Sequence, residues 1–254
     1  MSAIVFGTQS QTTENKFNRL KRAQQQAERE QVLIRRDAPG EAVCRDTRAR
    51  LEPFRVHFIV DEDNVVELAC NNVRVLTLSS IHSGDPECAR FARTIAIYFN
   101  YTKPVEIRLA LLERPKTLAH NRSMTMDDIN SGVTYRSENL IILWRYDRDF
   151  WKVFTHEMVH LTANDSDEAD TEARALDLWC MYRTRSYEEY QALKREQMAL
   201  SRRTAEKMLG ADGGSTNAIK YFVDALSILE GKKPVGCKDC HANGGEDEEL
   251  ILTI

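Results

Sequence analysis

Two histidines and a glutamate within five residues are the strongest chemical signal in this sequence. The segment His156-Glu157-Met158-Val159-His160 places the histidines four residues apart. Residues at this spacing share one face of an α-helix, so both imidazoles can bind one zinc ion and leave positions for a third ligand and a water. Glu157 lies beside that face, where it can take a proton from the water and pass it to a leaving amine. The pattern therefore predicts a Zn²⁺ site that hydrolyses peptide bonds.

The residues around this segment strengthen the prediction. Three fixed residues arise by chance in about one chain in a hundred of this length, and two histidines four apart by coincidence are the simpler alternative. Here, apolar residues between Phe150 and Leu161 favour an amphipathic helix, and the apolar run Leu140 to Trp144 precedes it. Zincin active sites have this order, because a peptide can lie along an edge strand and present its carbonyl to zinc. We therefore expect Leu140 to Trp144 to be that edge strand.

A third zinc ligand must come from outside the five-residue segment. No glycine turn with a further histidine follows His160, which argues against a class with three histidine ligands. Glu168 and Glu172 are four apart, so one could bind zinc while the other hydrogen-bonds a ligand histidine. We expect Glu172 to be the ligand, because Glu168 leaves less chain for the return turn, and Glu168 is the alternative. An acidic first helical turn, favoured by the helix dipole, would explain these carboxylates without a metal.

These residues resemble the gluzincin metallopeptidases, in which HExxH is followed by a glutamate on the next helix. The segments Ile129 to Thr134, Leu140 to Arg145 and Asp149 to Glu157 are also similar to predicted metallopeptidases encoded by large DNA viruses and related elements. The similarity covers roughly residues 130–175, under a fifth of the chain. It implies a viral protein with a zincin-like fold, zinc-dependent peptide hydrolysis, two histidine ligands and one glutamate ligand. The spacer from His160 to Glu172 is shorter than in thermolysin-like enzymes.

A peptidase also needs a donor for the oxyanion that forms at the scissile carbonyl. Tyr135 is our candidate; Tyr146, His120 and Tyr182 are alternatives, and ordinary packing would account for each. The neighbouring Asn130-Ser131-Gly132 segment is expected to form the turn before a strand, with a positive φ at the glycine, or to contact substrate backbone.

Apolar periodicity and turn residues predict the elements that position this chemistry. Expected strands, including a β-meander and a hairpin, are Arg55 to Val60, Val65 to Ala69, Val73 to Leu78, Val105 to Leu112, Gly132 to Tyr135 and Leu140 to Trp144. Expected helices are 12–36, 86–100, 150–160, 167–209 and 216–229. This pattern predicts an α+β fold, which the resemblance implies is zincin-like, with a small mixed sheet packed on the HExxH helix and a long ligand-bearing helix after it.

Composition shifts divide the chain into three parts. Residues 1–42 are expected to form an N-terminal helical or partly disordered arm, 43–209 the metallopeptidase domain, and 210–254 a C-terminal helix with a cysteine-containing tail. That tail contains Cys237, Cys240 and His241, a spacing that suits half a zinc site or a haem attachment site, although a flexible tail with two thiols is the simpler interpretation.

Charge and cysteine content narrow the function classes. The chain has 35 basic and 39 acidic side chains, a net charge of -4, which gives no argument for nucleic-acid binding. No apolar run is long enough for a membrane span, no signal peptide is evident, and the six cysteines are irregularly spaced, so we expect a cytoplasmic protein with reduced thiols. The expected partner is a peptide or protein substrate. The alternative is an inactive zincin-like protein that binds a partner and uses zinc only structurally, although such a protein has no chemical need of Glu157.

Overall fold

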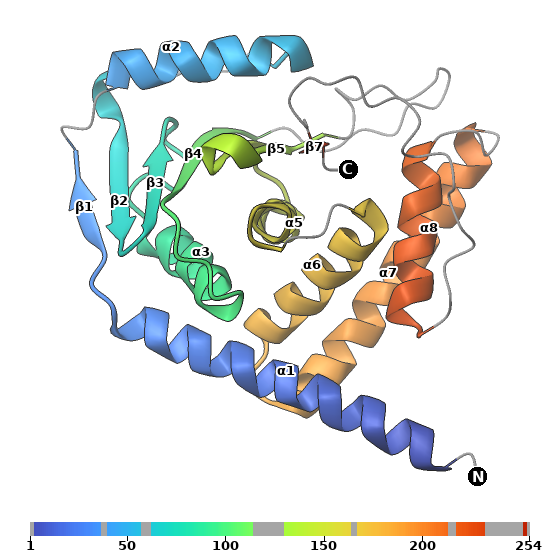
Figure 1. Cartoon of the computed structure of the whole chain (residues 1–254). Helices are drawn as coiled ribbons and strands as arrows, with labels where there is room; N and C mark the ends of the chain where they lie inside the picture. Colours follow the sequence, from blue (N-terminus) through green and yellow to red (C-terminus); the bar gives the residue numbers. More distant parts are fainter. Residues whose placement is uncertain are drawn as a thin grey trace.

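A mixed β-sheet forms the centre of the molecule (Figure 1). The computed structural model describes residues 3–36, 40–56, 62–113, 130–163, 167–212, 217–231 and 251–252. The strands in these ranges follow the order β1-β2-β3-β4-β6-β5-β7. Their bounds are β1 Leu33–Arg35, β2 Val66–Cys70, β3 Val73–Thr77, β4 Val105–Leu112, β5 Gly132–Tyr135, β6 Leu140–Arg145 and β7 Ile251–Leu252. The β3–β4 and β4–β6 pairs are parallel and the other pairs are antiparallel.

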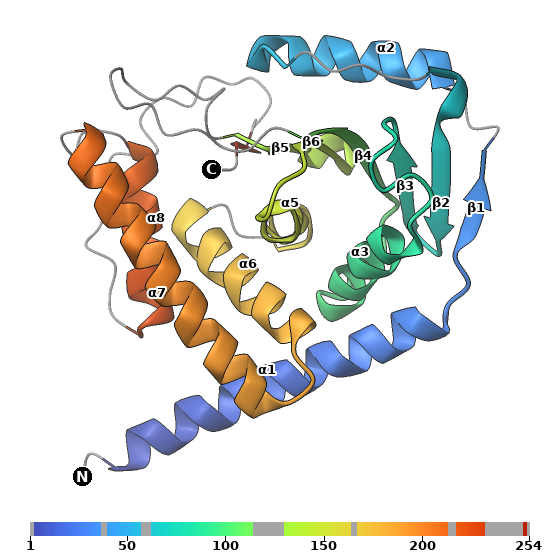
Figure 2. The ribbon, with the colours of Figure 1, turned by 180° about the vertical axis from the view of Figure 1, so that it is seen from behind.

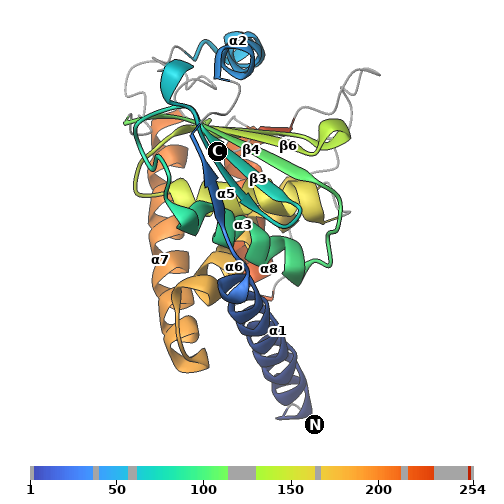
Figure 3. The ribbon, with the colours of Figure 1, turned by 90° about the vertical axis from the view of Figure 1, so that its left-hand side faces the viewer.

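Helices cover both faces of this sheet. The described helices are α1 Ala3–Arg29, α2 Gly40–Leu51, α3 Pro86–Tyr98, α5 Phe150–Thr162, α6 Glu168–Arg183, α7 Tyr187–Asp212 and α8 Asn217–Leu229. Figure 3 shows α2 on one face and α3 with α5 on the other, and the view from behind in Figure 2 shows α6 and α1 farther from the sheet. Among the described residues, no helix is long and apolar enough to cross a membrane.

The central strands explain this layered arrangement. Every residue of β6 is buried, as expected for a strand covered on both faces. Because side chains alternate along a strand, Ile141 and Leu143 pack in the core cluster that includes α3 and α5, whereas Ile142 and Trp144 pack in the cluster on the α2 side. The predicted α+β class, the mixed sheet packed on the metal helix and the following helix are thus confirmed.

The position of β6 corrects one expectation. This strand lies between β4 and β5, so it is not an edge strand. Its continuous apolar run is typical of an interior strand, and it is β5 that lies between β6 and β7. The hairpin itself is confirmed, since β5 and β6 pair antiparallel from Gly132 with Leu143 to Tyr135 with Leu140.

The predicted long helix over 167–209 is two helices, separated at 184–186. Thr184 leaves the helical conformation with ψ 158°, and its hydroxyl donates to the carbonyl of Cys180. Ser186 then accepts a hydrogen bond from the backbone of Glu189, whose carboxylate accepts one from the backbone of Arg185. This arrangement closely resembles a capping box, so the Ser-x-x-Glu signal at 186–189 predicts the break, and the sequence interpretation missed it.

The N-terminal segment packs against the rest of the molecule. Within α1, Phe17, Leu20, Ala23 and Ala27 are buried at helical spacing, and the helix contacts α3 and α6. Of the helical or partly disordered arm expected here, the structure shows a helix with one buried face. The sequence did not predict β1 or α2, and of the strand expected over Arg55 to Val60, residues 57–60 lie outside the described residues. The division of the chain at residues 42 and 209 stays a prediction.

Alternating charges cross the sheet on the face that α2 covers. Ion pairs join Arg35 to Glu67, Glu67 to Arg74, Arg74 to Glu106, Glu106 to Arg108, and Arg108 to Asp46 of α2. Opposite charges on adjacent strands stabilise a sheet. This charged ladder ties four strands to α2, whereas the opposite face of the same strands is apolar.

Candidate metal centre

Helix α5 carries the HExxH segment through the interior of the molecule. It begins after Asp149, whose backbone N–H donates to the side chain of Asp147. The helix packs on β5 and β6 on one side and on α6 on another. His156 is 1% exposed, and Glu157 and His160 are 0% exposed, so their chemistry depends on each other and on the elements packed around them.

Three side chains from α5 and α6 converge on one point. The Oε2 atom of Glu168 lies 3.3 Å from Nε2 of His156 and 3.3 Å from Nε2 of His160. Tetrahedral zinc with bonds of about 2.0–2.1 Å places its ligand atoms about 3.3 Å apart, so both separations fit. The two Nε2 atoms are 2.7 Å apart and share a hydrogen bond, and they would separate by about 0.6 Å around zinc. These residues form a group that could hold a metal ion.

Unpaired atoms support the same interpretation. Oε2 of Glu168 is buried and has no hydrogen-bond partner among the described residues, although it faces two imidazole nitrogens. Buried polar atoms are normally hydrogen-bonded. A carboxylate oxygen that faces two imidazole nitrogens can instead be satisfied by a metal cation that binds all three atoms. The residues present therefore fit a divalent metal such as zinc.

Glu172 occupies a different position from the one expected. Its Oε2 atom lies 2.7 Å from Nδ1 of His156, on the side of the ring away from His160. A carboxylate in this position fixes the tautomer and orientation of a ligand histidine. The structure thus brings both expected glutamates to His156, and Glu168, the alternative, rather than Glu172 belongs to the group that could hold a metal ion. The reason is the short connection, since α6 begins at Glu168 directly after its N-cap Asp167.

Glu157 lies between the metal group and β5. Its Oε2 accepts a hydrogen bond from the hydroxyl of Thr134 at 2.5 Å, and its Oε1 is buried without a partner among the described residues. A Cβ atom on Gly132 would lie 2.8 Å from Oε1 of Glu157 and 2.7 Å from a methyl of Leu143. The expected positive φ at Gly132 is wrong, because in the described residues only Gly84 and Gly231 are glycines with positive φ. Gly132 instead lets β5 approach Glu157 closely.

Burial and mutual charge shift the pKa of each group. Burial raises the pKa of Glu157 to about 8. Burial also lowers the pKa of His156, but the carboxylates of Glu168 and Glu172 outweigh it and raise the value to about 10. Burial and the charge of His156 lower the pKa of His160 to about 4. Burial raises the pKa of Glu168, but the two histidines beside its carboxylate outweigh burial and lower the value to about 2. Without a metal, His156 therefore holds a proton, and this proton supplies the positive charge that a bound cation would otherwise supply to the group.

The three candidate oxyanion donors that the structure describes have partners elsewhere in the molecule. The hydroxyl of Tyr135 donates to the carbonyl of Arg50 on α2 at 3.4 Å, and the Arg50 guanidinium lies over its ring. Because Thr134 faces Glu157, the next residue of the strand must face the opposite side. Tyr182 donates to Glu87, and Tyr146 packs against His82. His120, Cys237, Cys240 and His241 lie outside the described residues.

Two residues near the centre were not expected from the sequence. Thr134 contacts Glu157, and the Arg136 side chain donates to the carbonyl of His160 at 3.0 Å. Strand alternation from Gly132 could have found Thr134, because both residues share a face. Arg136 follows the strand, and no pattern marks it.

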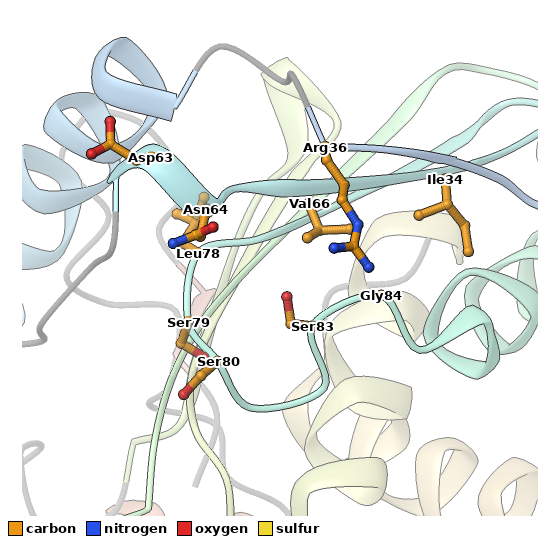
Figure 4. Close-up of a pocket in the computed structure, with 10 residues that line it drawn as sticks. All are labelled: Ile34, Arg36, Asp63, Asn64, Val66, Leu78, Ser79, Ser80, Ser83 and Gly84. Atoms are coloured by element: carbon orange, nitrogen blue, oxygen red, sulfur yellow. The ribbon is translucent and has the colours of Figure 1, made fainter.

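A separate cavity lies beside β1 and β2, at the end of the sheet away from β5. It has a volume of about 490 Å³ and contains none of the expected site residues (Figure 4). Its lining residues are Ile34, Arg36, Asp63, Asn64, Val66, Leu78, Ser79, Ser80, Ser83 and Gly84. The metal group is therefore a different site from this cavity.

The fold and the site define a class: an α+β protein with an HExxH helix and a glutamate from the following helix in one candidate metal centre. Comparison with protein-family models, curated proteins and solved structures finds no match. The function is therefore inferred from the geometry of this centre.

Proposed function

We propose that this chain is a zinc-dependent peptidase of the gluzincin type, with His156, His160 and Glu168 as zinc ligands. The observation that carries the proposal is the environment of Glu157. This carboxyl is completely buried beside the proposed ligands, and one of its oxygens has no hydrogen-bond partner among the described residues. An unsatisfied buried polar group costs free energy, and a purely structural zinc site has no need for it. A general base beside the metal accounts for its presence.

Each side chain then has a definite task. When bound, zinc lowers the pKa of a coordinated water from about 15.7 to about 7 and polarises a carbonyl. Glu157 accepts the proton of the attacking water at Oε1 and passes it to the leaving nitrogen, while Thr134 holds Oε2. Glu172 holds Nδ1 of His156, which directs Nε2 toward Glu168 and His160.

The neighbouring strand supports a peptide as the substrate. β5 runs beside the HExxH helix, and Thr134 on this strand contacts Glu157. An extended peptide can pair with the backbone of such a strand, which fixes the position of its carbonyl groups. This arrangement favours a peptide or protein over a small substrate without a backbone.

Zinc content and peptide cleavage test the proposal together. Purified wild-type chain is expected to bind zinc, measured by elemental mass spectrometry, and to cleave a mixed peptide library, measured by liquid chromatography with mass spectrometry. Glu157→Gln is expected to retain zinc and to lose activity by about 10²–10⁴-fold, because general base catalysis is removed. His156→Ala is expected to lose both.

The matched control is Glu138→Gln, which removes an exposed carboxylate that pairs with Arg50. It is expected to retain zinc and activity. Full hydrolysis by Glu157→Gln would show that the catalytic assignment is wrong. Zinc binding without cleavage of any peptide would instead favour the non-enzymatic alternative.

A further inference from the structure

The outer side of β5 is occupied by a strand from the far end of the sequence. β7 pairs antiparallel with β5, with Thr134 opposite Ile251 and Val133 opposite Leu252. Figure 1 shows β7 beside β5, and the strand order places β7 on the side of β5 away from β6. On this side of β5, Val133 and Thr134 are therefore paired with another part of the same chain.

This pairing falls on the part of β5 that approaches the general base. Thr134, which pairs with Ile251, donates to Glu157, and Gly132 nearby has no room for a side chain against the same carboxylate. A peptide added to β5 beside Glu157 needs the backbone groups that β7 uses, because each strand edge can pair with one partner at a time. β7 and such a peptide therefore exclude each other.

Among the described strands, β7 lies at the end of the sheet and has β5 as its one neighbour. A terminal strand with one neighbour opens at a lower free-energy cost than a central strand that pairs on both sides. Since the HExxH side chains are at most 1% exposed, a peptide also requires some element to move, and β7 is suited to do so.

We propose that β7 is an exchangeable, autoinhibitory occupant of the peptide-binding edge of β5. The segment blocks the edge in the structure described here and must leave before an extended peptide pairs with Val133 and Thr134. The inference rests on the proposed function in taking a peptide as the partner. An edge that β7 occupies for about 90% of the time weakens the apparent affinity for a competing peptide about tenfold.

Peptide binding without cleavage tests this inference. In a full-length chain that carries Glu157→Gln, the double substitution Ile251→Pro with Leu252→Pro removes two backbone N–H donors. The matched control, Ile251→Val with Leu252→Val, keeps both donors and a high β propensity. The probe is a fluorescent synthetic peptide with the sequence of residues 248–254, and its binding is followed by fluorescence anisotropy.

The proline variant is expected to bind the probe about tenfold more tightly than its parent, whereas the valine control keeps the parent's affinity. Unlabelled peptide should displace the probe. Equal affinity of the proline variant and its parent, or no binding by any variant, overturns the inference. Circular dichroism checks that all variants are folded.

Cleavage assays with Glu157 restored separate this inference from the proposed function. If the proline variant gains binding but no chain cleaves peptides, the edge inference stands and the peptidase proposal fails. If the chain cleaves peptides but the proline substitutions change neither binding nor rate, the peptidase proposal stands and the inference fails.

Discussion

The two ends of the sheet, one at β1 and the other at β5 and β7, differ in how far their strands are covered. At one side, β1 exposes Leu33 and Ile34 by 45% and 50%, and Arg35 with Arg36 adds charge beside them. At the other, all four residues of β5 are buried, and the strand lies between β6 and β7 and packs against α5. Charged residues beside an open edge discourage pairing with other chains. The comparison indicates that the candidate metal centre lies beside the strand that packs against α5, whereas the more exposed β1 tolerates changes in its sequence.

Removal of the proposed zinc ligand Glu168 should have the largest effect. Glu168→Ala is expected to lower zinc affinity by more than about 100-fold, because loss of an outer hydrogen-bond partner alone typically costs about 10–100-fold. Glu172→Ala should fall within that smaller range, since Glu172 contacts only Nδ1 of His156. Competition with a zinc-binding dye measures both affinities, with the exposed Glu196→Ala as control. A greater loss in Glu172→Ala would return Glu172 to the role of third ligand.

A single methyl group on β5 should have the next largest effect. Gly132→Ala places a Cβ atom 2.7 Å from Leu143 and 2.8 Å from Glu157, so the strand must move away from the helix. We expect a loss of about 1–3 kcal/mol in the free energy of unfolding, as for other overpacked sites. Urea denaturation measures it. Unchanged stability, together with unchanged hydrolysis, would mean that the close approach of β5 to α5 is not required.

An ion pair near β1 should show a smaller, pH-dependent effect. Arg93 donates to both carboxylate oxygens of Glu30, which joins the end of α1 to α3. This bond lowers the pKa of Glu30 below its ordinary value of 4.5. The stabilisation is therefore complete above the ordinary value and is lost as the pH falls through the lowered one.

Glu30→Gln should consequently cost about 1 kcal/mol at pH 7 and less under acidic conditions. Thermal unfolding of both proteins over a range of pH measures the difference. A gap that widens with acidification would contradict the assignment.

The smallest effect is expected on the exposed face of β1. Ile34→Lys should change the free energy of unfolding by less than about 0.5 kcal/mol, because the side chain is half exposed. Urea denaturation again measures the free energy of unfolding, so the value can be compared directly with that of Gly132→Ala. A loss greater than about 1 kcal/mol would show that this side of the sheet is as constrained as β5.

Local spacing was sufficient to predict several parts of the molecule. The pair His156 and His160, the hairpin that precedes them, and the α3 helix capped by Asp85 all follow from patterns within about a dozen residues. Ser186 and Glu189 also indicate the break between α6 and α7, but the apolar periodicity across it favoured one long helix.

Tertiary packing determines the rest. The choice between Glu168 and Glu172 depends on where α6 begins relative to α5, which no local pattern reports. The space at Gly132 depends on the approach of a strand to a helix, and the pairing of β7 joins residues far apart in the sequence. The interior position of β6 likewise depends on the order of strands.

The charged ladder beneath α2 has a consequence for how mutations combine. Glu67 is 7% exposed and pairs with Arg35 and Arg74, while Glu106 is shared between Arg74 and Arg108. Each of these two glutamates therefore has two partners, and removal of one charge changes the balance for its neighbours. The effects of single substitutions on the free energy of unfolding will therefore not be additive. Thermodynamic coupling between these residues will extend across the four strands.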